Sequence, residues 1–187
     1  MANVFRSEVV LKGSDAAIES FVEMYFSLAQ ERKYLDFEKV LPLNGEQPYE
    51  VWGSSSEAYN FEIVRSCKGE FVFRFDVAER LPVQIFLKLL SEKGSFSEIS
   101  VVSCCEFLSE VLELVGKKDL FITNFYWEDR TPISRKLIKK TAKRLWGYSK
   151  RPNLEAQGFI HVGGGQFIKI HFDPSGLEDL YPRFKKA

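Results

Sequence analysis

The stretch NFEIVRSCKGEFVFRFDV, residues 60–77, decides how the fold is interpreted. Its second half alternates three phenylalanines with more polar residues, which is typical of a strand with one buried face and one partly solvated face. The Lys68-Gly69 pair between the halves suits a tight turn. The stretch therefore predicts a β-hairpin with strands at 60–67 and 70–77.

The flanking segments extend this hairpin into a regular order of elements. Upstream, the pattern predicts a strand at 3–11 and an amphipathic helix from its N-cap Ser14 to about Gln30. Downstream, it predicts a helix begun by Pro82 that runs to about 93, then a strand at 98–104. Strand, helix, strand, strand, helix, strand is the order of an α+β ferredoxin-like domain, with an antiparallel sheet and both helices on one face. We assign this domain to residues 1–105.

Residues 106–187 are expected to form an α+β extension packed on that domain. Their pattern predicts a helix at 107–115, a strand at 120–127, a helix at 133–148 and a hairpin at 158–172. The polar stretch 35–59 is predicted to be a long loop. Its Tyr49 and Trp52 either anchor it to the core or contact a ligand, and we favour anchoring.

Composition indicates a soluble globular protein. The chain is 45% hydrophobic and contains 17 Phe, which is enough apolar material for a sizeable core. The N-terminus lacks a signal-peptide pattern, and no run approaches 18 apolar residues. We therefore expect a cytoplasmic protein that does not span a membrane.

The cysteine pattern argues against both disulfides and zinc. Cys67, Cys104 and Cys105 are odd in number, and the adjacent pair would point to opposite faces of a strand. Neither paired Cys-x-x-Cys nor His at helical spacing occurs. We expect buried structural thiols, no metal and no cofactor.

Several residues of the first 105 resemble one known family. They are Phe37 with Leu41-Pro42, the Trp52-Gly53 pair, Phe71, Phe73 and Phe75, and then Pro82 and Ile99. This pattern resembles the YubB or Api92-like ferredoxin-like family of plasmids, phages and other mobile elements. The resemblance implies the fold and a setting in mobile DNA, and it implies no active site.

Charge is strongly segregated along a chain whose formal net charge is zero. Residues 130–151 contain nine Lys or Arg and no Asp or Glu, whereas residues 1–129 contain 13 basic against 22 acidic residues. Such segregation steers an anionic partner toward one end of a fold.

The predicted helix at 133–148 separates an apolar side from a cationic side. The cationic residues are Arg135, Lys136, Lys139, Lys140 and Lys143, with Arg144 at the margin. A solvated outer face is the simpler interpretation. However, like charges four residues apart repel one another, and an anionic partner would relieve that repulsion.

The predicted hairpin at 158–172 turns at Gly163-Gly164-Gly165. Pairing Val162 with Gln166 places Ile160 opposite Ile168 and leaves a second face of aromatic and cationic residues. That face consists of Phe159, His161, Phe167, Lys169 and His171. It would stack bases and hold phosphates, or its phenylalanines would instead pack under the basic helix.

No residue pattern specifies a reaction, so we expect a binding module rather than an enzyme. The function that we expect is contact with nucleic acid, or with a nucleic-acid-handling complex, through the basic C-terminal surface. One alternative is an anti-CRISPR-like inhibitor of a host defence complex, in which the acidic first two-thirds mimic nucleic acid or the basic helix binds an acidic protein surface. A further alternative is a phosphodiesterase that uses His161 or His171 as general base.

Overall fold

The computed structural model describes residues 3–29, 32–106, 108, 110–117, 120–126, 133–147 and 159–169. The strands of the main sheet are β1 (Val4–Lys12), β4 (Tyr59–Cys67), β5 (Glu70–Ala78), β6 (Glu98–Cys105), β7 (Val111–Lys117) and β8 (Leu120–Tyr126). The short strands are β2 (Phe26–Ala29), β3 (Arg32–Leu35), β9 (Ile133–Ser134), β10 (Phe159–Gly163) and β11 (Gln166–Lys169). The helices are α1 (Asp15–Tyr25), α2 (Phe37–Val40), α3 (Pro48–Trp52), α4 (Val83–Ser91), the 3-10 turn η1 (Glu92–Ser95) and α5 (Arg135–Trp146). The α+β class expected from the sequence is confirmed.

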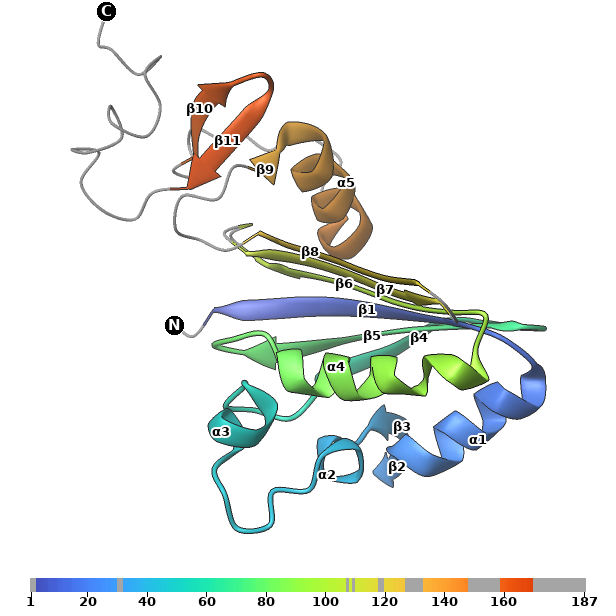
Figure 1. The fold of residues 1–187 in the computed structure, drawn as a ribbon. Coiled ribbons are helices and arrows are strands. Elements are labelled where there is room, and N and C mark those ends of the chain that lie inside the picture. Colours follow the sequence, from blue (N-terminus) through green and yellow to red (C-terminus); the bar gives the residue numbers. More distant parts are fainter. Residues whose placement is uncertain are drawn as a thin grey trace, which may run out of the picture.

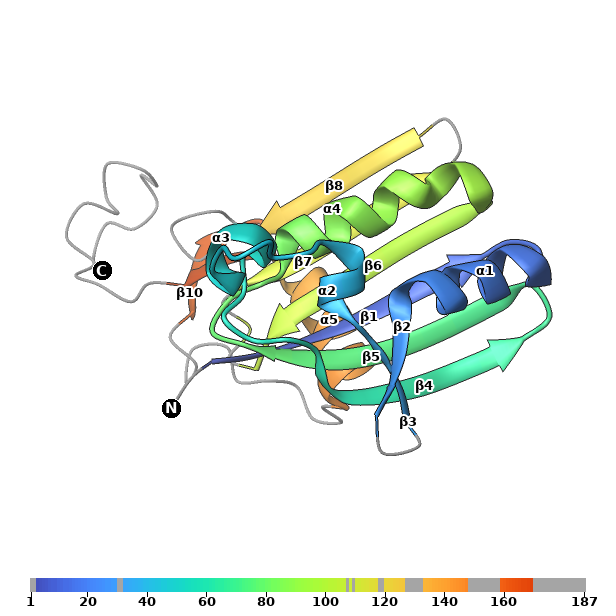
Figure 2. The same ribbon diagram turned by 90° about the horizontal axis from the view of Figure 1, so that it is seen from below.

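The main sheet has the order β4-β5-β1-β6-β7-β8, and every neighbouring pair is antiparallel. Helices α1 and α4 lie on one face of the sheet, whereas α5 and the small sheet β10-β11-β9 lie on the other (Figure 1). Seen from the α1 and α4 side, β4 and β8 form the two edges (Figure 2). The sheet is therefore covered by helices on both faces.

The main hydrophobic core fills the space between the sheet and the first four helices. It is built on the side chains that the alternation of β1 and β5 directs to one face, such as Phe5, Val9, Phe73 and Phe75. The opposite face of β1 is also largely buried, because α5 packs on β1 and β6. A second, smaller cluster lies there and includes Val102, Ile138 and Leu145.

Helix α1 begins where the sequence predicts and ends earlier. The Ser14 hydroxyl accepts from the Ala17 N–H at 3.2 Å and caps the first turn. The helix ends at Tyr25, five residues before the expected end, because Phe26 is extended and begins the hairpin β2–β3. The Phe26 ring packs edge-on against Phe61 and Phe73, so tertiary packing overrides the helical pattern.

The segment 35–59, predicted to be a loop, contains the short helices α2 and α3. Trp52 is buried, and its Nε1 donates to the Leu41 carbonyl at 2.7 Å. Its ring also packs edge-on against Phe37. Trp52 therefore anchors this segment to the core, as expected, whereas Tyr49 is exposed and stacks beneath the Arg80 guanidinium.

The helix predicted at 107–115 is wrong, since Val111–Lys117 forms strand β7. Alternate residues of this segment face opposite sides of the sheet, and the run pairs with β6 from Glu98↔Lys117 to Cys104↔Val111. Apolar residues occur on both sides of the run because both faces of the sheet are covered here, and this arrangement resembles helical spacing in the sequence. The extension therefore continues the main sheet.

The three cysteines lie in two environments. Cys105 belongs to the main core and Cys104 to the second cluster, which confirms that the adjacent pair points to opposite faces of β6. Cys67 lies on the edge strand β4 and is exposed, so the expectation of a buried thiol is wrong at this position. Its neighbours on β4 are exposed as well, because β4 is an edge strand of the sheet.

Candidate nucleic-acid interface on helix α5

Helix α5 is oriented by its apolar side. Ile138, Ala142 and Leu145 recur at four and three residues and are buried in the second cluster, with Thr141 buried beside them. The helix ends at Trp146. The next residue, Gly147, has a positive φ of 66°, which residues with a side chain rarely adopt. Lys143 and Arg144 lie in the last turn, where positive charge interacts favourably with the helix dipole.

The opposite side of α5 presents lysines to solvent. Lys136, Lys140 and Lys143 are exposed, and Lys139 is half-buried. Lys140 Nζ lies 3.8 Å from Glu113 Oε1 on β7, a distance at which an exposed pair contributes little stability. The outward row predicted from the sequence therefore contains Lys136, Lys140 and Lys143.

Arg144 is turned toward the sheet and does not belong to this row. Its Nε donates to Glu8 Oε1 at 2.5 Å, and the Arg74 Nε donates to Glu8 Oε2 at 2.6 Å. Glu8 is buried on β1, directly opposite Arg74 on β5. The expectation that Arg144 contributes to a free cationic surface is corrected, because a carboxylate from the start of the chain neutralises it.

A second ionic group lies next to this one at the end of α5. The Arg6 guanidinium donates two parallel hydrogen bonds of 2.8 Å to the Asp76 carboxylate, and Asn60 Nδ2 donates to the same carboxylate at 3.1 Å. The Arg6 guanidinium lies 4.5 Å from the centroid of the Trp146 ring. The hydrogen bond to Asp76 raises the pKa of Arg6, and the contact with the Trp146 ring connects the same guanidinium to α5.

The hairpin β10–β11 has the predicted pairing of Ile160 with Ile168, while the turn differs. Gly163 pairs with Gln166, and a bulge falls between His161 and Gly163. Phe159 opposes Lys169 in the ladder. Val162 therefore does not face Gln166 as predicted.

The aromatic face predicted for this hairpin is not open as a whole. Phe167 is 3% exposed and belongs to the cluster under α5, so its ring is not available to stack on a base. His161 is exposed, and the centroid of its ring lies 5.0 Å from the centroid of the Phe167 ring. Arg135 begins α5, and His171 lies outside the described residues.

Within the ranges given above, the structure brings no three His, Cys, Asp or Glu side chains together as metal ligands. No helix in this part of the chain is long and apolar enough to cross a bilayer.

Sequence reasoning missed the acids that organise this surface. The sequence pattern places Asp76 on a partly solvated strand face and assigns no role to Glu8, although each faces an arginine across the ladder between β1 and β5. The signal was present, because Arg6 and Glu8 alternate on one strand as Arg74 and Asp76 do on the other. Two such strands in antiparallel register place opposite charges together.

The chain was compared with known proteins at three levels. None of the protein-family models, curated proteins or solved structures that were compared matches it.

Proposed function

We propose that this protein is a non-enzymatic binding module that engages nucleic acid, or a complex that handles nucleic acid, through the outward side of α5. The observation that carries the proposal is the exposed row Lys136, Lys140 and Lys143 on a helix whose opposite side is fixed to the sheet. No acidic residue interrupts the sequence from 130 to 151.

The row has dimensions that suit a phosphate backbone. Seven residues separate Lys136 from Lys143, which is about 10 Å along the helix at 1.5 Å per residue. Phosphates on one strand of a duplex are spaced about 3.4 Å apart along the axis, so the row spans about three of them. Like charges on neighbouring turns repel, and phosphates would relieve this repulsion.

We also propose that the first 105 residues are a ferredoxin-like domain of the YubB or Api92-like type from a mobile element. The order of the strands supports this part of the proposal. Along the chain, β1, β4, β5 and β6 are the first, second, third and fourth strands of the predicted domain. In the sheet they lie in the order β4-β5-β1-β6, which is the strand order of the split βαβ arrangement. Helices α1 and α4 connect them on one face.

A pair of charge-matched variants tests the binding proposal. Lys136→Glu/Lys143→Glu changes the outward row, whereas Lys33→Glu/Lys68→Glu changes two exposed lysines elsewhere by the same total charge. Anisotropy titrations with labelled 20-nucleotide single-stranded DNA, RNA and duplex DNA, from 25 to 200 mM salt, would measure affinity and its salt slope.

We expect the α5 variant to bind more weakly than the original chain. Each lost phosphate contact lowers the slope of log affinity against log salt by about 0.7 for single strands or about 0.9 for a duplex. Two lost contacts should therefore lower it by about 1.4 or about 1.8. The matched variant should retain the slope of the original chain. Absence of binding to all three probes at 25 mM salt, or equal losses in both variants, would overturn the proposal.

A further inference from the structure

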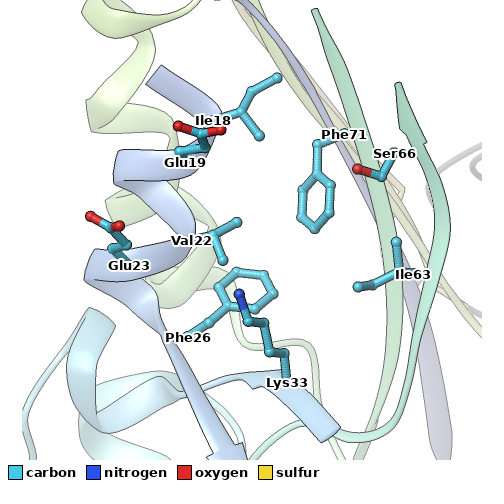
Figure 3. Close-up of a pocket in the computed structure, with 9 residues that line it drawn as sticks. All are labelled: Ile18, Glu19, Val22, Glu23, Phe26, Lys33, Ile63, Ser66 and Phe71. Carbon is cyan, nitrogen blue, oxygen red and sulfur yellow. The ribbon is translucent and has the colours of Figure 1, made fainter. Parts of the chain in front are cut away.

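A groove lies on the face of the sheet opposite α5, between helix α1 and the edge strand β4. It has a volume of about 290 Å³ and is open to solvent along one side. Ile18 and Val22 of α1 form one wall, Ile63 of β4 forms the other, and Phe26 and Phe71 lie between them (Figure 3). The groove therefore has an apolar part beside an edge of the sheet, and four of its nine lining residues are polar or charged.

Two large apolar side chains, one lining the groove and one near it, are exposed. Ile63 is 47% exposed, and Leu28 is 68% exposed. Leu28 opposes Lys33 across the hairpin β2–β3, and Lys33 lines the groove, so Leu28 shares that face. Exposed apolar area of this kind next to a hollow is characteristic of a surface that another molecule covers.

The helical wall of the groove is acidic. Glu19 and Glu23 both line it, and both are exposed. They are four residues apart on α1, a helix that contains no Lys or Arg between Asp15 and Tyr25. Like charges at this spacing repel, so a cationic partner that approaches this wall would be stabilised.

The edge strand itself favours a helical occupant over an extended one. Val64 is an extra residue where the pairing between β4 and β5 shifts from Ile63 to Arg65. A bulge of this kind twists an edge and discourages the addition of another strand. A helix needs no ladder of hydrogen bonds and places an apolar side chain in a groove instead.

The chain's own basic helix is not the occupant. The apolar side chains of α5 are buried against β1 and β6, which leaves that helix without an apolar side to insert. We infer that the groove between α1 and β4 binds a basic amphipathic helix of a partner protein, with an apolar side chain between Val22 and Ile63 and cationic groups against Glu19 and Glu23. Those carboxylates lie about 6 Å apart along α1, which matches Lys or Arg residues four positions apart on the partner.

A synthetic peptide tests binding to this groove, and no residue of α5 is changed in the experiment. The probe is a fluorescein-labelled 14-residue peptide of leucine and lysine in a helical pattern, and its control has glutamate in place of every lysine. Ser66→Trp fills the groove from an exposed position on β4, and Ser20→Trp adds the same ring at an exposed position of α1 outside the groove. Glu19→Lys/Glu23→Lys reverses the acidic wall, and Glu46→Lys/Glu50→Lys makes the same charge change at exposed positions elsewhere.

We expect the lysine peptide to bind at least tenfold more tightly than the glutamate peptide, and each groove variant to weaken that binding at least tenfold. Ser20→Trp and Glu46→Lys/Glu50→Lys should bind as the original chain does. Equal affinity for the two peptides would overturn the inference, as would equal behaviour of each groove variant and its matched control. Because no α5 residue is changed, these outcomes are independent of nucleic-acid binding.

Discussion

Arg144, near the end of α5, donates to the Glu8 carboxylate in the middle of β1 across 136 positions of sequence. Arg74 holds the other oxygen of the same carboxylate, and Glu8 is only 5% exposed. A buried carboxylate between two guanidinium groups connects the helix to two strands at once. The contact orients α5 so that Lys136 and Lys143 face solvent, and it removes Arg144 from the cationic surface.

Removing this carboxylate is expected to destabilise the fold. Deleting one partner of a buried ion pair costs about 3–5 kcal/mol, and because both arginines are partly exposed we expect about 2 kcal/mol for Glu8→Ala. Arg144→Ala should cost about 1 kcal/mol, whereas the neighbouring, exposed Lys143→Ala should cost less than about 0.5 kcal/mol. Urea unfolding of the three variants measures these differences. Equal destabilisation by Arg144→Ala and Lys143→Ala would show that the ion pair does not hold the helix.

The elements that were predictable from sequence are those whose local pattern agrees with their tertiary environment. Strands β1, β4, β5 and β6 form where the sequence pattern predicts them, α5 has separate apolar and cationic sides, and Ser14 caps α1 as expected. Segment 111–117 was misassigned because both of its faces are covered, which removes the alternation that distinguishes a strand.

The candidate site was predictable only in part, for a related reason. The outward position of Lys136 follows from helical periodicity, a local property. The pairing of Arg144 with Glu8 and the burial of Phe167 depend on which face of the sheet receives α5. That choice depends on contacts between distant segments, which a single sequence does not display.

Phe167 is expected to anchor the hairpin β10–β11 to α5. Its ring is buried with Ile138 and Leu145, so Phe167→Ala should cost about 3 kcal/mol through lost burial and the cavity that remains. His161→Ala removes an exposed ring from the same face and should cost less than about 1 kcal/mol. Thermal unfolding followed by circular dichroism compares the two variants. A fully stable Phe167→Ala protein would indicate that the hairpin does not depend on this contact.

The last prediction concerns alkaline pH and the contact between α1 and η1. The Tyr25 hydroxyl donates to Glu92 Oε1 at 2.9 Å, and burial together with this hydrogen bond raises the pKa of Tyr25 from 10.0 to about 12. Between these two pH values the unfolded chain releases the phenolic proton while the folded chain keeps it. The contribution of Tyr25 to stability is therefore complete below pH 10 and is lost as pH rises through about 12.

Tyr25→Phe removes the ionisable group while keeping the ring that packs edge-on against Phe21. We expect this variant to be less stable than the original chain at pH 8, because the hydrogen bond to Glu92 is lost. The difference between the two proteins should shrink from pH 10 to 12, since only the original chain loses the Tyr25 contribution there. Urea unfolding at intervals of half a pH unit measures this difference, and a constant difference across that range would contradict the assignment.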